Sequence, residues 1–136
     1  MYERQEEFAN RWVEQAIGFY KTVGRDVALA EFSNPRGMFV QDERYVFVLS
    51  PTGTMLAHGV NKRFVGLDFS QVRDSDGKPF NKEILENANT NGNGWVTYKW
   101  YHPRRKKLIP KIAYFQKEDD MIFCSAVYED EEACLI

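Results

Sequence analysis

The chain has 136 residues, of which 43% are hydrophobic and 15% aromatic, and its formal net charge is −2. This composition is globular rather than disordered, and the length suits one domain, residues 1–136, with a core of its own. The acidic balance argues against a nucleic-acid partner, which requires a basic face, and no apolar run approaches the roughly 18 residues of a membrane span.

The first predicted element is a long amphipathic helix over about residues 3–23, with Gly24 at its end. Its first turns are rich in glutamate, and its apolar residues recur at helical spacing: Phe8, Trp12, Ala16, Phe19 and Val23. A shorter helix over about residues 26–32 is expected to turn Val27 and Leu29 inward, and it ends before Pro35 because a proline disfavours helix in the residue that precedes it.

A β-hairpin is predicted next, in the segment YVFVLSPTGTMLAHG, where two apolar runs flank a Pro-Thr-Gly turn. A loop region over residues 60–79 follows, and then a short helix over about residues 81–89, with Asn81 as its N-cap. Three further strands are joined by tight turns and therefore pair antiparallel: about residues 95–101, 108–116 and 121–128.

This order of elements predicts an α+β fold, a five-stranded antiparallel sheet with the long helix across one face. The loop and short helix after the hairpin must cross the other face as a flap. A sheet covered in this way encloses a cavity that suits a small molecule. The basic turn at residues 104–107 is expected to be solvated rather than a phosphate site.

Few groups in the sequence suit a metal, a cofactor or catalysis. Cys124 and Cys134 lack metal-site spacing, and Cys124 is expected to be a small core residue. Only His58 and His102 are available as histidine ligands. No glycine-rich loop precedes a helix to hold a phosphate, and no catalytic dyad can be placed, so we expect no cofactor and no enzyme activity.

Four motifs carry a resemblance to a known family: the hairpin FVLSPTGTMLAHGVN, the turn DGKPF, the strand GWVTYKW and a strand with the pattern PK-x-x-Y. In this combination, over roughly residues 12–128, the chain resembles the single Cache domains, PAS-like sensor modules of bacterial chemoreceptors and histidine kinases. The resemblance implies a PAS-like fold, binding of a small polar metabolite such as a short carboxylate, a role in signal transduction, and a periplasmic location. The start MYERQEEFANRW has no signal peptide, so a cytoplasmic location and an excised receptor domain both stay open.

His58 and Lys111 are the two polar residues of greatest interest. His58 ends a strand where the sheet gives way to the flap, so its imidazole can meet a ligand or hold the following loop through a backbone carbonyl. Lys111 interrupts the apolar strand LIPKIAYF. A buried ammonium there needs solvent, an acidic side chain or an anionic ligand, and we favour the ligand.

Aromatic residues on the strands can supply cavity walls that combine apolar area with single hydrogen bonds. Strand alternation puts Trp95 on one face, and Tyr98 and Trp100 on the other, which we expect to be the flap side. The candidate ligand-binding set is Tyr45, His58, Trp95, Tyr98, Trp100, Lys111, Tyr114 and Tyr128. The alternative to a sensor is a non-catalytic interaction module that uses the same fold without a ligand and forms a homodimer through the long helix.

Overall fold

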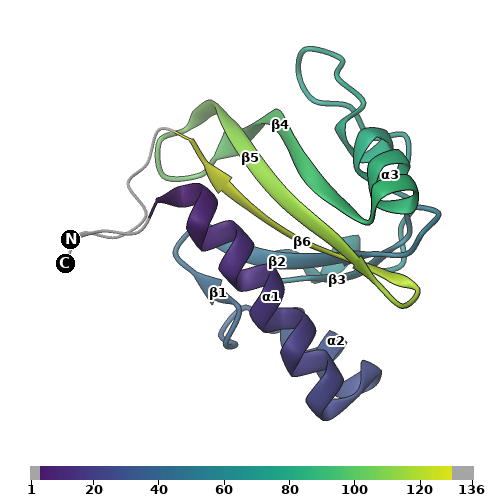
Figure 1. Ribbon diagram of the computed structural model, residues 1–136. Helices are drawn as coiled ribbons and strands as arrows, with labels where there is room; N and C mark the ends of the chain where they lie inside the picture. Colours follow the sequence, from purple (N-terminus) through teal and green to yellow (C-terminus); the bar gives the residue numbers. More distant parts are fainter. Residues whose placement is uncertain (1–3, 130–136) are drawn as a thin grey trace.

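The computed structural model of the chain describes residues 4–129, which form one antiparallel sheet flanked by helices (Figure 1). The helices are α1 (Gln5–Val23), α2 (Arg25–Phe32) and α3 (Phe80–Asn91), with a short 3-10 helix, η1 (Lys62–Phe64), in the loop before α3. The strands are β1 (Val40–Gln41), β2 (Arg44–Leu49), β3 (Met55–His58), β4 (Asn93–His102), β5 (Lys107–Glu118) and β6 (Met121–Tyr128).

The sheet confirms the predicted α+β fold and adds one strand to it. Its order is β1-β2-β6-β5-β4, with every pair antiparallel, and β3 also pairs with β2. Because β6 occupies one edge of β2, strands β1 and β3 share the other edge, with Val40 opposite Tyr45 and Phe47 opposite His58. The sheet therefore has six strands rather than five, since the two-residue β1 carries no hydrophobic pattern by which it could be recognised.

Helix α1 lies across one face of the sheet, as predicted, and packs on β5 and β6 (Figure 1). It ends at Gly24, which has a φ of +89° and donates its N–H to the carbonyl of Tyr20 at 2.8 Å. Helix α2 buries Ala28 and Phe32, four residues apart, whereas Val27 is exposed. The expectation that Val27 turns inward is therefore wrong, because this short helix contacts the core along one narrow stripe.

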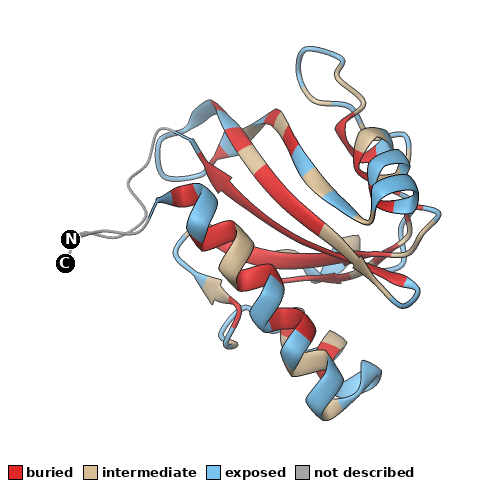
Figure 2. Ribbon diagram, in the orientation of Figure 1, coloured by how far each residue is buried: buried red, intermediate tan, exposed pale blue. Residues whose placement is uncertain are grey.

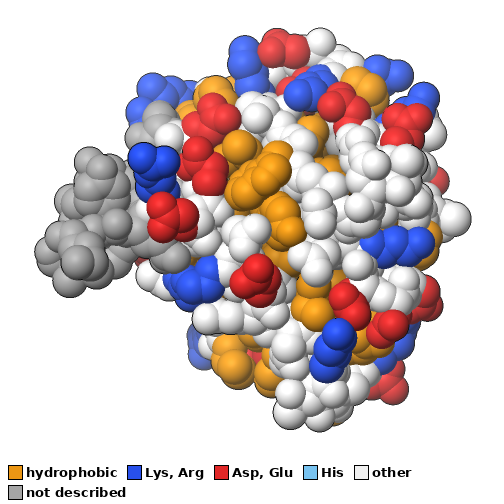
Figure 3. Space-filling view, viewed as in Figure 1, with side chains coloured by type: hydrophobic (Ala, Val, Ile, Leu, Met, Phe, Trp, Pro, Cys, Tyr) orange, Lys and Arg blue, Asp and Glu red, His pale blue; other side chains and the backbone are white. Residues whose placement is uncertain are grey.

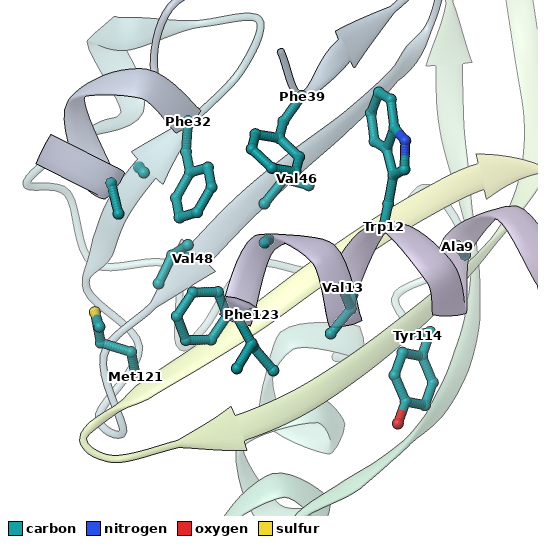
Figure 4. Packing of buried hydrophobic residues seen from close by; sticks show 14 of the residues in the cluster. Ala9, Trp12, Val13, Phe32, Phe39, Val46, Val48, Tyr114, Met121 and Phe123 are labelled. Carbon is teal, nitrogen blue, oxygen red and sulfur yellow. The ribbon is translucent and has the colours of Figure 1, made fainter. Parts of the chain in front are cut away.

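Strand β6 is buried along its whole length because both faces of the sheet are covered (Figure 2). Met121 and Phe123 belong to the cluster under α1 (Figure 4), as does Val127. Ile122, Cys124 and Ala126 belong to the cluster on the opposite side. Cys124 is fully buried, as expected for a core residue, and Cys134 lies outside the described residues.

Helix α3 and the loop before it cover the face opposite α1, and Ile84 and Ala88 are buried there. The helix begins at Phe80 with Pro79 in the N-cap position, so the prediction of Asn81 as N-cap is wrong. Asn81 lies inside the first turn, and its side chain is buried rather than turned back to the free N–H groups of the helix end. The loop of the flap, residues 59–79, returns along β3, where the N–H of Met55 donates to the carbonyl of Leu67 at 2.9 Å.

The surface carries charges of both signs, and they are interspersed on the face shown in Figure 3. The basic turn at residues 104–107 is exposed, as expected, and Arg104 forms an ion pair with Glu43 at 2.9 Å. Among residues 4–129, no helix has the length and apolar content needed to cross a membrane.

Candidate ligand-binding site

Two adjoining cavities lie between the sheet and the flap, and they share Tyr45, His58, Phe64 and Trp100 as walls. The outer cavity has a volume of about 360 Å³, which is within the range of small-molecule sites. Its other lining residues are Asp42, Glu43, Val60, Asn61, Tyr101, Pro103 and Tyr128. The inner cavity, of about 20 Å³, has room for one water-sized group. Its other lining residues are Phe47, Met55, Phe69, Phe80, Asn81 and Tyr98.

Lys111 lies directly behind the cavity wall and is fully buried. Its Nζ donates to the hydroxyl of Tyr45 at 3.5 Å and lies 4.7 Å from the ring centroids of both Tyr45 and Tyr128. Such cation–π contacts partly compensate an ammonium for the loss of water. Since Tyr45 lines both cavities and Tyr128 lines the outer one, the positive charge is one side chain away from any bound molecule.

His58 both lines the cavities and holds the flap. Its Nδ1 accepts hydrogen bonds from the backbone N–H groups of Asn61, at 2.9 Å, and Val60, at 3.2 Å. The predicted anchor was a carbonyl, so the direction of this hydrogen bond is corrected: the ring accepts. An accepting Nδ1 leaves the proton of the neutral ring on Nε2, which is then a donor. Burial and, to a smaller extent, the nearby charge of Lys111 lower the pKa of His58 to about 4.

Aromatic stacking joins the sheet to α3 on the inner side of the site. The rings of Tyr98 and Phe80 are parallel, with centroids 3.9 Å apart and an interplanar angle of 8°. Trp100 approaches Phe80 edge-on at 5.9 Å. Burial raises the pKa of the phenols of Tyr45 and Tyr98, so both hydroxyls keep their protons as hydrogen-bond donors.

The structure brings together six of the eight candidate residues. Lys111 lies behind the cavity wall. The other five line a cavity: Tyr45, His58, Tyr98, Trp100 and Tyr128. Tyr114 instead belongs to the cluster under α1 (Figure 4), and Trp95 packs against it with ring centroids 4.9 Å apart. These two residues are removed from the candidate set, because alternate residues of a strand face opposite sides of the sheet.

The sequence interpretation missed the part of the wall that comes from the loop of the flap and from α3: Val60, Asn61, Phe64, Phe69, Phe80 and Asn81. The position of these side chains depends on how the loop folds, which no periodicity reveals. Phe47 was also missed, although it is two residues from Tyr45 on β2 and therefore shares its face.

Comparison with known proteins gives a consistent result. The family model described as single Cache domain 2 matches residues 27–132. The methyl-accepting chemotaxis protein McpP of Pseudomonas putida is 28% identical over 98 residues, which cover 71% of this chain and 18% of that receptor. The chain therefore corresponds to a small part of the length of this curated relative.

Solved structures share the fold. A Cache chemosensory domain, solved to explain its recognition of carboxylic acids, aligns with a TM-score of 0.76 at 25% identity, over 93% of this chain and 94% of that one. A methyl-accepting chemotaxis protein from Vibrio parahaemolyticus aligns with a TM-score of 0.78 at 15% identity, over 93% and 89% of the two chains. A periplasmic sensor domain of a chemotaxis protein aligns with a TM-score of 0.67 at 24% identity, over 91% and 90%.

Proposed function

The chain belongs to the single Cache domain family, and from this premise we propose that it is a sensor domain that binds a short carboxylate between the sheet and the flap. The observation that carries this proposal is the buried ammonium of Lys111, held against two tyrosine rings of the cavity wall. The similar Cache domain solved to explain carboxylic acid recognition supports the same ligand class.

Tyr45 is the proposed link between Lys111 and the ligand. Its oxygen accepts a hydrogen bond from Lys111, so its own proton is available for a carboxylate oxygen, and the neighbouring charge makes it a stronger donor. The Nε2–H of His58 offers a second donor. Trp100 and Phe64, shared by both cavities, enclose the short carbon skeleton.

The charges at the rim of the outer cavity favour an acid with one carboxylate. Asp42 and Glu43 line this rim, and Glu43 is paired with Arg104. A second carboxylate on the ligand would approach Asp42 and be repelled, whereas the charge of Glu43 is offset by Arg104. We therefore propose monocarboxylates as the preferred class.

In its biological setting, the domain is proposed to report ligand binding to a larger signalling protein, as a part of a chemoreceptor or sensor kinase. A periplasmic location belongs to the same proposal, and we expect binding without turnover. These features follow from the kind of protein in which related domains occur.

A ligand screen tests the proposal directly. The melting temperature is expected to rise by several degrees with acetate, propionate or butyrate in excess, because a ligand that binds only the folded state stabilises it. The matched neutral amides, such as propionamide, are expected to produce no rise. If no acid shifts the melting temperature and light scattering shows a dimer, the ligand-free interaction module is the better description.

Two tryptophans of β4 distinguish the proposed site from the opposite face. Trp95→Ala is expected to leave the affinity for the best acid within about twofold, because Trp95 packs on Tyr114 and away from the cavities. Trp100→Ala removes a wall of both cavities. It is expected to lower the affinity for the same acid several-fold more than Trp95→Ala does. Equal effects of the two variants in calorimetric titrations would contradict the proposed location.

A further inference from the structure

Asn81 is a buried polar side chain that the fold does not explain. It is 3% exposed, and among residues 4–129 its Oδ1 accepts no hydrogen bond. It does not cap α3, since Pro79 holds that position. A buried acceptor without a donor is costly, so native structures retain one only where something else compensates.

The surroundings of Asn81 indicate what kind of group would compensate. Asn81 lines the inner cavity beside Phe80 and Tyr98, and this cavity has room for one water-sized group. A hydroxyl fits both the volume and the acceptor. An ammonium fits poorly, because the positive charge of Lys111 already lies behind Tyr45 and would repel a second cation in this cavity.

The inner and outer cavities share four wall residues and therefore adjoin. We propose that Asn81 accepts a hydrogen bond from a hydroxyl of the ligand, so that the preferred ligand is a short hydroxy acid. This inference rests on the proposed function, in which the carboxylate binds near Tyr45 and His58, and it assigns the inner cavity to the hydroxyl.

A site built around a buried acceptor rejects analogues that lack the matching donor. Propionate, 2-hydroxypropionate and 3-hydroxypropionate, titrated calorimetrically, differ only by this group. At least one hydroxy acid is expected to bind about tenfold more tightly than propionate. The matching fluoropropionate is expected to bind no better than propionate, since fluorine is close to a hydroxyl in size but has no proton to donate.

The variant Asn81→Leu keeps the branched shape of the side chain and removes its acceptor. Its preference for the hydroxy acid is expected to fall to within about twofold, while propionate still binds. Asn87→Leu is the matched control, because Asn87 lies on the exposed side of α3 and donates to the carbonyl of Glu83 at 3.0 Å. It is expected to keep the full preference.

The outcomes separate this inference from the proposed function. Equal wild-type affinities for propionate and the hydroxy acids, or a preference that survives in Asn81→Leu, would overturn the role of Asn81 and leave the carboxylate site intact. If none of the acids binds to the wild type, the proposed function and the inference both fail. If circular dichroism shows that Asn81→Leu does not fold, Asn81→Ala replaces it. The comparison of fluoropropionate with the hydroxy acid in the wild type then tests the role of the hydroxyl independently.

Discussion

Replacing Lys111 with methionine is expected to weaken the binding of a short carboxylate by roughly ten- to a hundredfold, because opposite charges one side chain apart attract each other by about 2 kcal/mol in a protein interior. The ammonium supplies the positive charge behind the site, and it also directs the proton of Tyr45 toward the ligand. Methionine has neither property. The loss is therefore expected for acids and not for their neutral amides.

The same substitution is expected to leave the fold intact. Methionine is unbranched and similar in length to lysine, so it can fill the fully buried space between Tyr45 and Tyr128. Replacing a buried charge with a packed apolar side chain is often neutral or stabilising. The melting temperature of Lys111→Met is expected to equal or exceed that of the wild type.

Lys99→Met provides the matched control. Lys99 lies on β4 between Tyr98 and Trp100, but its ammonium pairs with Asp76 at 3.1 Å on the surface, and Lys99 is not among the residues that line the two cavities. Calorimetric titration of the three proteins with one acid measures the effect. Equal affinities in the wild type and Lys111→Met would exclude Lys111 from the site, and a lower melting temperature with unchanged affinity would assign it a structural role.

The strands and the residues on them were predictable because a strand has a period of two. Once the segment 95–101 is recognised as a strand, Tyr98 and Trp100 must share a face, and both lie on the flap side together with Lys111 of the neighbouring strand. The same rule separates Trp95 from Tyr98 by their positions in the sequence. Trp95 and Tyr114, which pack together on the opposite face, were wrongly predicted as ligand-binding residues. Their aromatic character suggested a cavity wall, although the alternation indicates the other face.

The contribution of the flap could not be predicted, because no local signal fixes where a loop side chain points. Asn81 shows the difficulty. Its identity favours a helix N-cap, but Pro79 takes that position and the asparagine is carried into the first turn, where packing of α3 on the sheet buries it. A tertiary contact decides the outcome, and only the folded chain reveals the inner cavity that Asn81 lines.

The free energy of unfolding is expected to fall by about 3 kcal/mol as the pH decreases from 6.5 to 4, because of His58. Burial and then the charge of Lys111 lower the pKa of His58 from 6.5 to about 4 in the folded chain. Between these values the unfolded chain binds a proton that the folded chain does not bind, so acid favours unfolding. The contribution of His58 to the free energy of unfolding is therefore present in full above pH 6.5 and is lost progressively below it.

The local reason is that Nδ1 is an acceptor for two backbone N–H groups of the flap. Protonation turns this atom into a donor that faces two other donors, so the flap loses both hydrogen bonds. Asparagine places an oxygen close to the position of Nδ1 but does not titrate. His58→Asn is therefore expected to keep the flap anchored and to show a much flatter dependence of stability on pH.

Urea unfolding of the wild type and His58→Asn between pH 4.5 and 7 measures this difference. Hydrogen bonds lower the pKa of the carboxyl groups of Asp68 and Asp74. Their contribution is present in both proteins and is lost only at still lower pH, so it cancels in the comparison. A pH dependence that is unchanged in His58→Asn would show that other groups cause it.

The charge of Lys111 is the second cause of the lowered pKa of His58, and this links the two predictions. In Lys111→Met the pKa of His58 is expected to rise toward its usual value, since a neutral neighbour no longer opposes protonation of the ring. The pH interval in which stability is lost then becomes narrower, and the total loss becomes smaller than in the wild type. Titration of the His58 ring by NMR in both proteins measures the shift directly. An identical pKa in the two proteins would mean that burial alone keeps His58 neutral and that the ammonium does not act on the ring.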